Sequence, residues 1–418
     1  MALKIREENC KPRYKDDKYN IVFFWKQNDT GLYGRRQDML IKYLAQSPKV
    51  NKIIHFDAPM EVGTLILQLN WSKKRKVSET NLVFLQTVSR MLGFKKSPKI
   101  KYYTFVYSSN KPNRRLARRL MPQKSEYLRY IKTVLERNNI WDHRTIFWVC
   151  PKNFDFPKIV SAFNPDLVLA DVIDDHRGWY ENNMPEVHRL TENYREILGL
   201  SDIVLANCQN VKDSMSVFSD NIHVVPNACE LPEFNVHYTM PGDLKKIKRP
   251  IIGYVGNLSS RIDIPLLEHV ATKRPDWNIV LIGSTHGAQD ILKLESYKNI
   301  HFFGVKKYNV VRQYIGNFDV AIIPHLNNEL SRSMNPLKAF VYCSMNVPVV
   351  STEIHNLDEL LDLVYVSRDK NEFIEKIELA LAKGKSQYLS EEQIILLKKN
   401  CWDERVAQIL SLINNKLG

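Results

Sequence analysis

Two adjacent aspartates and a histidine, Asp174, Asp175 and His176, follow an apolar run at residues 167–171 that has the character of a buried strand. Adjacent carboxylates repel each other and raise each other's pKa, which is a common way to tune a general base. Asp174 is therefore the first candidate for a catalytic base. Asp175 ranks second, because its carboxylate could instead orient His176. A solvated turn capped by Asp175 is the alternative interpretation. No second cluster of acids or histidines stands nearby at metal-ligand spacing, so we expect no metal site.

A second candidate site follows a strand-like run in the other half of the chain. Gly256 ends this run, the polar residues Asn257 and Ser259 come next, and Arg261 adds a forked guanidinium that suits phosphate oxygens. The segment predicts a cradle for a diphosphate at the start of a helix, with an ordinary turn between strand and helix as the alternative.

A third candidate site lies at residues 335–338, where the sequence predicts the start of a helix. Asn335 suits the cap of this helix, and Pro336 suits its first turn. Lys338 then lies beside the positive end of the helix dipole, which is unfavourable for a lysine unless an anion neutralises both charges. The position therefore predicts an anionic ligand.

The loop after the first predicted strand contains Gly31 and Gly34, followed by Arg35. Glycines let backbone amides approach an anion at a helix N-terminus, so we take these three residues as candidates for acceptor binding. An ordinary turn is the alternative, because the two glycines do not form a G-x-G-x-x-G motif.

The elements that must position these residues are short β-branched or aromatic runs that alternate with longer segments of helical spacing. This alternation predicts βαβ units and parallel sheets, in which ligands bind beyond the carboxyl ends of the strands. The predicted strands are residues 21–25, 52–57, 102–107, 145–150, 167–171, 203–207, 223–226, 251–256, 279–283, 300–304, 320–324, 347–352 and 364–366. A polar stretch at residues 238–250, with Pro and Gly, predicts an interdomain linker.

The composition is that of a folded protein of two or three domains, because 418 residues with 44% hydrophobic and 25% charged residues exceed one ordinary core. We expect a cytoplasmic protein, since the first 20 residues lack an apolar signal region and no apolar run reaches the roughly 20 residues that span a bilayer. Six scattered cysteines without a C-x-x-C pair argue against a zinc site and a disulfide framework.

The net charge of +14 is concentrated in one segment, because residues 73–137 contain 18 Lys or Arg and three acids. Such a segment is either a solvated surface or the contact site of an anionic partner. No signature of an RRM, KH, zinc-finger or helix-turn-helix module accompanies the charge, so we expect no nucleic acid partner.

The motifs of both halves resemble those of GT-B glycosyltransferases, and the second half is similar to the nucleotide-binding domain of GT4-like bacterial polysaccharide (capsule and exopolysaccharide) enzymes. The matching segments are 201–207 (SDIVLAN), 224–227 (VVPN), 252–256 (IGYVG), 275–283 (PDWNIVLIG), 299–304 (NIHFFG), 318–324 (FDVAIIP), 335–338 (NPLK) and 348–351 (PVVS). The resemblance covers residues 167–352 and does not include the basic segment.

This resemblance implies an α/β protein of the GT-B fold, with two Rossmann-like domains whose parallel sheets face a central cleft. Residues 1–240 are then an acceptor-binding domain that contains the basic segment 73–137. Residues 241–400 are a nucleotide-sugar-binding domain, and residues 401–418 form a helix that crosses back to the first domain.

The implied activity is metal-independent transfer of a sugar from a nucleotide-diphosphate sugar, with a UDP-sugar favoured, and without a cofactor. The acceptor is a lipid-linked or polysaccharide glycan of the cell surface. The Asp174 to His176 loop would face the acceptor hydroxyl. The implied donor-binding residues are Gly256, Asn257, Ser259, Arg261, Asn335, Lys338 and Tyr342.

One position departs from the family pattern. Where related enzymes have a glutamate that holds the nucleotide ribose, this chain has Val341, and the first acid of the common E-x7-E pair is replaced by Ser333. Ribose contacts must then come from elsewhere, and Glu329 and Tyr342 are candidates.

The basic segment predicts contact with an anionic membrane on its inner face, because cations alternate there with apolar residues. The candidate membrane residues are Arg114, Arg115, Arg118 and Arg119. An anionic polysaccharide suits the same charge. Three alternatives to the transferase stay open, namely a non-catalytic GT-B-like subunit of a membrane glycan-assembly complex, a sugar-nucleotide epimerase and a nucleic acid binder.

Overall fold

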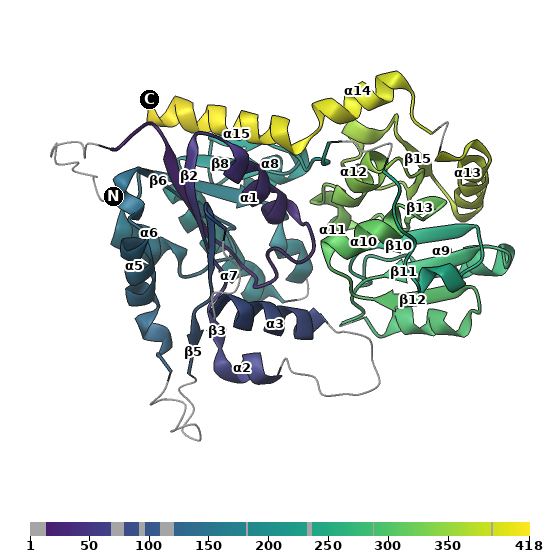
Figure 1. Ribbon diagram of the computed structural model, residues 1–418, viewed down its shortest axis with the longest axis horizontal. Coiled ribbons are helices and arrows are strands. Elements are labelled where there is room, and N and C mark those ends of the chain that lie inside the picture. The colour runs from purple at the N-terminus through teal and green to yellow at the C-terminus, as the bar shows by residue number, and fades with distance from the viewer. Residues whose placement is uncertain are drawn as a thin grey trace.

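The computed structural model describes residues 14–67, 79–91, 97–108, 121–180, 183–231, 236–286, 288–385 and 388–418. These residues form two large parallel sheets, each in its own domain and each covered by helices (Figure 1). The predicted α/β architecture with parallel sheets is confirmed.

The first domain contains a seven-stranded parallel sheet with the strand order β4-β2-β1-β6-β7-β8-β9. Its central strand β1 pairs with β2 on one side and with β6 on the other. The strands are β1 (Tyr19–Phe24), β2 (Val50–Phe56), β4 (Ile100–Tyr103), β6 (Arg144–Val149), β7 (Leu167–Val172), β8 (Ile203–Ala206) and β9 (Ile222–Val224).

The second domain contains a six-stranded parallel sheet with the order β12-β11-β10-β13-β14-β15. Its strands are β10 (Ile251–Val255), β11 (Asn278–Ile282), β12 (Ile300–Gly304), β13 (Val320–Ile323), β14 (Val349–Thr352) and β15 (Val364–Ser367). Every predicted strand overlaps an observed one, because continuous runs of β-branched and aromatic residues are typical of strands that are buried on both faces.

Side chains alternate between the two faces of each sheet, which gives each domain two cores. In β1, for example, Val22 and Phe24 face one core and Ile21 and Phe23 face the other. The first core includes α5 (Tyr127–Arg137), α6 (Phe156–Phe163), α7 (Met184–Leu200) and α8 (Gln209–Met215), and the second includes α1 (Arg36–Gln46) and α15 (Trp402–Leu417).

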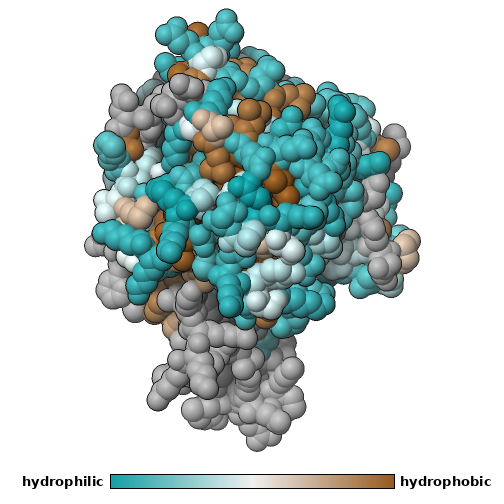
Figure 2. Space-filling model, turned by 90° about the vertical axis from the view of Figure 1, so that its right-hand side faces the viewer, coloured by the Kyte–Doolittle hydropathy of each residue, from teal (hydrophilic) through white to brown (hydrophobic). Residues whose placement is uncertain are grey.

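The second sheet is covered in the same way. One face packs against α10 (Tyr308–Ile315), α12 (Leu337–Ser344) and α14 (Glu391–Lys399), and the other packs against α9 (Ile264–Lys273) and α13 (Lys370–Lys383). The outer face of this domain is mostly hydrophilic, with small hydrophobic patches (Figure 2). The remaining helices are α2 (Val62–Leu67), α3 (Glu79–Met91) and α11 (Glu329–Arg332), and the 3-10 turns are η2 (Lys124–Glu126), η3 (Ile140–Asp142), η4 (His176–Tyr180), η5 (Leu244–Lys246), η6 (Asp290–Ser296) and η7 (Asp358–Leu360).

One predicted strand is interrupted in the structure. The run 102–107 forms β4 at the edge of the large sheet and then β5 (Val106–Tyr107), which pairs with β3 (Met60–Glu61) in a separate two-stranded sheet. Between them the Thr104 hydroxyl donates a hydrogen bond to Asp57, which turns the chain out of the large sheet. Periodicity does not reveal such a contact, because its partner lies 47 residues away in the sequence.

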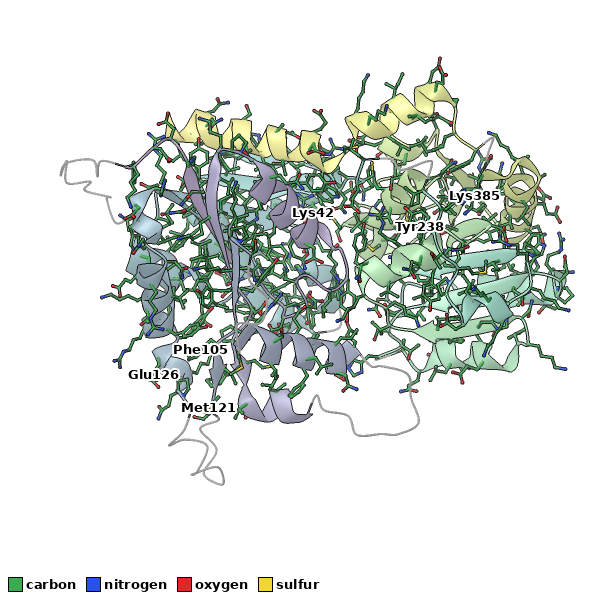
Figure 3. All side chains as sticks on the ribbon, viewed as in Figure 1. Lys42, Phe105, Met121, Glu126, Tyr238 and Lys385 are labelled. Atoms are coloured by element: carbon green, nitrogen blue, oxygen red, sulfur yellow. The ribbon has the colours of Figure 1, made fainter. Side chains whose placement is uncertain are left out.

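The chain passes between the domains twice, and the two connecting segments, near Cys229 and near Asn400, lie side by side. Backbone hydrogen bonds join Cys229, just before the linker, to Asn400 and Trp402, where the chain enters α15. Helix α15 carries Trp402, Val406, Ile409 and Ile413 into the core that α1 shares, so the C-terminal helix packs on the first domain. Lys42 and Tyr238 lie on either side of the boundary between the domains (Figure 3).

Candidate functional site

A cleft of about 620 Å³ lies between the two domains, at the carboxyl ends of strands from both sheets. It is lined by residues that follow β1 and β7 of the first domain and β10, β11 and β13 of the second. The predicted site residues that line it are Gly34, Arg35, Asp174, Gly256, Asn257, Ser259, Arg261, Asn335, Lys338 and Tyr342. Gly31, Asp175 and His176 do not line it, and Arg114, Arg115, Arg118 and Arg119 lie outside the described residues.

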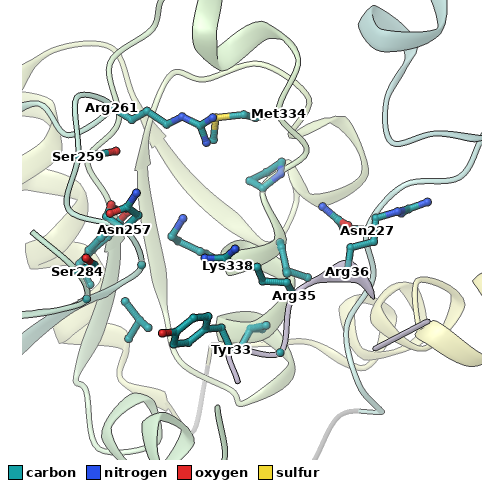
Figure 4. Close-up of a pocket in the computed structure, with 18 of the residues that line it drawn as sticks. Tyr33, Arg35, Arg36, Asn227, Asn257, Ser259, Arg261, Ser284, Met334 and Lys338 are labelled. Atoms are coloured by element: carbon teal, nitrogen blue, oxygen red, sulfur yellow. The ribbon is translucent and has the colours of Figure 1, made fainter. Parts of the chain in front are cut away.

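Lys338 lies at the centre of the cleft (Figure 4), and Gly256 makes room for its side chain. A Cβ atom on Gly256 would stand 2.2 Å from the Lys338 Cε, and a Cβ on Gly283 would stand 1.7 Å from the Gly256 carbonyl oxygen. The ammonium also lies 5.5 Å from the ring centroid of Tyr254. The lysine stem therefore requires glycine at position 256, and the Gly256 carbonyl requires glycine at position 283.

The charge of Lys338 is unfavourable in the ligand-free protein. Burial lowers its pKa to about 8, and the positive charges of Arg261 and Arg35 add to this decrease. Asp174 opposes the decrease only in part. An anion in the cleft would reverse the balance, because it would neutralise cations that now repel each other.

Arg261 brings a second cation to the same cleft from the second domain. Its guanidinium carbon lies 4.7 Å from the ring centroid of Trp179 in the first domain, so the pair spans the cleft. The Arg261 Nη2 is buried without a hydrogen-bond partner among the described residues. Other buried polar atoms of cleft residues share this condition, among them the Tyr33 hydroxyl, His325 Nδ1, Asn207 Oδ1 and Asn227 Oδ1. Unsatisfied polar atoms of this kind are expected where a polar ligand supplies the missing partners.

Asp174 faces the cleft from the end of β7. No described residue forms a hydrogen bond with its carboxylate, and only its backbone oxygen accepts one, from the Tyr194 hydroxyl at 3.3 Å. Burial raises the pKa of the Asp174 carboxyl, while the charges of Lys26 and Arg261 oppose that increase. The carboxylate is therefore available to accept a proton from a ligand hydroxyl.

His176 is buried behind Asp174 and holds a lysine toward the cleft. Lys26 donates to the His176 Nε2, so that nitrogen must be the acceptor, because an ammonium group can only donate. The Nδ1 then carries the proton and donates to the Tyr194 hydroxyl at 2.9 Å. Burial keeps the pKa of His176 well below its ordinary value, with the Lys26 charge acting in the same direction, so the ring stays neutral. His176 thus positions Lys26 and does not itself reach the cleft.

Asp175 differs from its neighbour in direction and partners. Arg177 donates to its carboxylate through Nε at 2.9 Å and Nη2 at 2.7 Å, and the Ser214 hydroxyl donates at 2.6 Å. The carboxylate makes no contact with His176, so the expectation that Asp175 orients this histidine is wrong. Its bidentate ion pair with Arg177 is a structural role.

The glycine loop also differs from the expectation of an exposed anion site. The backbone amides of Gly31 and Arg35 donate to the carboxylate of Asp38, which occupies the place of an external anion. Gly34 packs against the second domain instead, because a Cβ on it would lie 2.3 Å from the ring of Tyr308. The loop therefore serves the contact between domains, and Arg35 and Gly34 reach the cleft from it.

Asn335 and Tyr342 line the cleft but use their polar groups within the protein. The Asn227 backbone amide donates to the Asn335 Oδ1 at 2.8 Å, and helix α12 is capped at Pro336, so Asn335 links the two domains and is not the helix cap. The Tyr342 hydroxyl accepts from the Val255 amide at 2.8 Å and donates to its carbonyl at 3.3 Å. These bonds fix the end of β10, and the Tyr342 side chain is 1% exposed. The side chain of Glu329 lies outside the described residues.

The cleft also contains residues that the sequence analysis did not select, namely Lys26, Tyr33, Glu79, Trp179, Tyr254, Ser284 and His325. Lys26, Ser284 and His325 each lie just after a strand, so the strand-end rule applied to every loop would have found them. Tyr33 and Glu79 come from a loop and a helix start with no distinguishing pattern. No three His, Cys, Asp or Glu side chains cluster at metal-binding range, and no helix is long and apolar enough to cross a membrane, in the part of the chain that the structure describes.

Comparison with known sequences gives a match over the second domain. Residues 249–383 match the family Glycosyl transferases group 1. TuaH of Bacillus subtilis (strain 168), which is named as a glycosyltransferase of teichuronic acid biosynthesis, is 21% identical over 275 residues, or 61% of this chain and 68% of TuaH.

Comparison with solved structures extends the likeness to both domains. Sucrose-phosphate synthase from Thermosynechococcus elongatus has a TM-score of 0.63 at 11% identity, covering 95% of this chain and 98% of its own. Anabaena Alr3699/HepE, solved with UDP and glucose, has a TM-score of 0.59 at 14% identity, with 94% and 99% covered. A structure from E. coli, described as trehalose-6-phosphate bound with UDP-2-fluoro glucose, has a TM-score of 0.62 at 13% identity. The match covers 94% of this chain and 98% of that chain. At these identities the likeness establishes the fold.

Proposed function

We propose that this chain, which has the GT-B fold and whose second domain matches the group 1 glycosyl transferases, moves a sugar from a nucleotide-diphosphate sugar to a glycan acceptor. The observation that carries the proposal is the arrangement of charges in the cleft. Lys338 and Arg261 of the second domain face Asp174 of the first across the space that a donor and an acceptor would share.

In the proposed reaction, the new glycosidic bond forms as the bond to the diphosphate breaks. The acceptor oxygen bonds to the anomeric carbon of the donor sugar, its proton passes to the Asp174 carboxylate, and the bond from that carbon to the diphosphate oxygen breaks. The leaving diphosphate gains negative charge, which Lys338 and Arg261 stabilise from positions already held by the fold. No described residue supplies these two cations with an ion-pair partner within 4 Å, so their charge is available to the diphosphate.

The donor that we propose is a UDP-sugar, and the acceptor is a lipid-linked or polysaccharide glycan of the cell surface. The uridine nucleotides in the Anabaena and E. coli structures support the donor, and the teichuronic acid pathway in the name of TuaH supports the acceptor. Two domains that close over the cleft would also exclude water from the reacting sugar.

We also propose that the basic segment 73–137 places the enzyme on the inner face of a membrane, where a lipid-linked acceptor resides. The support is its charge, 18 Lys or Arg against three acids. Replacing Arg114, Arg115, Arg118 and Arg119 with Gln should reduce sedimentation with vesicles containing phosphatidylglycerol, and added salt should reduce the binding of the unchanged protein. Equal sedimentation of both proteins at every salt concentration would contradict membrane contact through these arginines.

The first experiment is calorimetry with UDP, followed by assays for sugar transfer from UDP-sugars to membrane extracts. Asp174→Asn should bind UDP normally and lose transfer, since the amide cannot take the acceptor proton. Lys338→Ala should weaken UDP binding about 10-fold to 100-fold, because a charge-assisted hydrogen bond contributes roughly 1.5–3 kcal/mol. If neither UDP nor another nucleoside diphosphate binds, the non-catalytic subunit becomes the better interpretation.

A further inference from the structure

Acidic side chains are scarce in the cleft, and they lie on one domain only. Among the described residues that line it, only Asp174 and Glu79 are acids, and both belong to the first domain. The second domain offers a largely apolar wall at the ends of β11 and β12 and along α10 and α12, formed by Ile282, Val305, Val311, Ile315 and Val341. A polar ligand group that lies along this wall must find its hydrogen-bond partners on the opposite domain.

Tyr33 of the first domain points into this part of the cleft. Its side chain lies on the far side of Lys338 from Arg261, and its hydroxyl is directed toward the wall that carries Ser284 (Figure 4). The hydroxyl is buried and has no hydrogen-bond partner among the described residues. The Arg35 guanidinium lies over its ring at 5.1 Å, which fixes the direction of the side chain. A buried phenol without a partner costs free energy unless a ligand supplies one.

Glu79 lies beside Tyr33 at the start of α3. Its Oε1 is 4.0 Å from the Arg35 Nη2, and its side chain is 32% exposed. Arg35 contacts both residues, because its guanidinium also lies 5.1 Å from the Tyr33 ring centroid. The Glu79 charge adds to burial in raising the pKa of the Tyr33 hydroxyl. A neutral phenol, which can donate, therefore lies close to a carboxylate, which can accept two hydrogen bonds.

The direction of the donor follows from the charges at the other end of the cleft. Because Tyr33 lies on the far side of Lys338 from Arg261 (Figure 4), a diphosphate held by Arg261 and Lys338 leaves the nucleoside room to extend toward Tyr33. The ribose of a nucleotide presents two adjacent hydroxyls, each a donor and an acceptor. A carboxylate and a phenol that both contact Arg35 and line the same cleft match such a diol.

We propose that Glu79 and Tyr33 bind the 2′ and 3′ hydroxyls of the donor ribose, so that the first domain reads the nucleoside sugar across the cleft. This inference rests on the proposed function, since it names contacts of the same donor. It assigns to α3 and the loop before α1 a role in donor selection, and it leaves the transfer step to Asp174, Lys338 and Arg261.

The test compares UDP with 2′,3′-dideoxy-UDP by calorimetry on the full chain. For UDP, Glu79→Gln should weaken binding about tenfold and Tyr33→Phe about fivefold. For the dideoxy nucleotide, which lacks both hydroxyls, neither variant should change the affinity. Glu136→Gln, which alters an exposed glutamate on α5, is the matched control and should bind both ligands as the unchanged protein does.

The outcomes separate the two proposals. Variants that weaken both nucleotides equally, or that leave UDP binding unchanged, would overturn the ribose assignment while UDP binding that depends on Lys338 still supports the transferase. Absence of binding of UDP and of every other nucleoside diphosphate by the unchanged protein would overturn both. Thermal unfolding of each variant shows whether the fold is retained, and the conservative Tyr33→Phe change keeps the ring that packs under Arg35.

Discussion

At the scale of single residues, the most informative feature is a lysine whose charge is unfavourable without a ligand. Burial, followed by Arg261 and Arg35, lowers the pKa of Lys338 to about 8. The amine is therefore mostly charged at pH 7 and mostly neutral at pH 9. A bound diphosphate favours the charged form, so binding and protonation must be linked.

This linkage predicts that UDP affinity is nearly constant below pH 7 and falls as the pH rises through about 8, by up to tenfold for each further unit. Lys338→Arg should bind UDP with little change across pH 7–9.5, because a guanidinium stays charged over that range. Calorimetry in buffers of matched ionic strength measures both. A parallel fall in affinity for the two proteins would show that another group controls the pH dependence.

The contact between Lys26 and His176 gives a second prediction at this scale. The orientation of the His176 ring depends on the Tyr194 hydroxyl, which accepts a hydrogen bond from its protonated nitrogen. Tyr194→Phe should release the ring and, with it, the direction of Lys26 beside Asp174. We expect transfer to slow roughly tenfold, since small displacements of catalytic groups are costly, with little change in the KM for donor. Loss of donor affinity with unchanged kcat would assign Tyr194 a different role.

At the scale of elements, the ends of β10 and β11 form the floor of the cleft. The Val255 amide and carbonyl are held by Tyr342, and Gly256 and Gly283 let the two loops and Lys338 pack together. The ends of β10 and β11 and the first turn of α12 thus pack in direct contact with one another. The position of the lysine is consequently a property of packing and not of its own helix alone.

The two glycines should respond differently to alanine. Gly283→Ala places a methyl group 1.7 Å from a backbone oxygen that cannot move freely, so we expect a loss of about 2–4 kcal/mol in the free energy of unfolding. Gly256→Ala meets the flexible end of Lys338 and should cost less stability, but it should weaken UDP binding at least tenfold. Denaturant unfolding and calorimetry measure the two effects. Equal stability losses with unchanged UDP affinity would contradict the packing argument.

At the scale of the whole molecule, Glu230 joins the domains. It forms ion pairs with Lys42 of α1 and Arg312 of α10, and it accepts a hydrogen bond from the Tyr308 hydroxyl at 2.7 Å. Burial alone would raise the pKa of Glu230, but the bonds from Lys42 and Tyr308 lower it below its ordinary value. The cluster therefore stabilises the arrangement in which both domains face the cleft.

Glu230→Ala should separate the domains, increase the radius of gyration in solution scattering and weaken UDP binding. The expected loss in stability is roughly 1–3 kcal/mol at pH 7, since three donors lose their acceptor. Because the pKa of Glu230 is depressed, its contribution is complete above its unfolded pKa and disappears as the pH falls through the lower folded value. Glu186→Ala, which removes only a local pair with Arg189, should leave the radius of gyration unchanged. Similar scattering from both variants would show that Glu230 does not hold the domains together.

The sequence by itself determined the strands and the loops that carry the chemistry. Buried strands of a parallel sheet are continuous apolar runs, so their positions are local information, as residues 320–323 illustrate. The rule that ligands bind beyond strand ends then selected Asp174, Gly256 and Arg261. The unfavourable position of a lysine at the start of a helix selected Lys338, and the structure brings all four residues to one cleft.

Tertiary structure decided which side chains face the ligand. Asp174 and Asp175 are equivalent as neighbours in sequence, and only Arg177 and Ser214 show that one of them is already paired. Similarly, the Gly31 amide is taken by Asp38, and Gly34 is explained by Tyr308, which lies 274 residues away in the other domain. A local pattern identifies groups capable of chemistry, whereas the partners that occupy or free those groups are set by packing between distant segments.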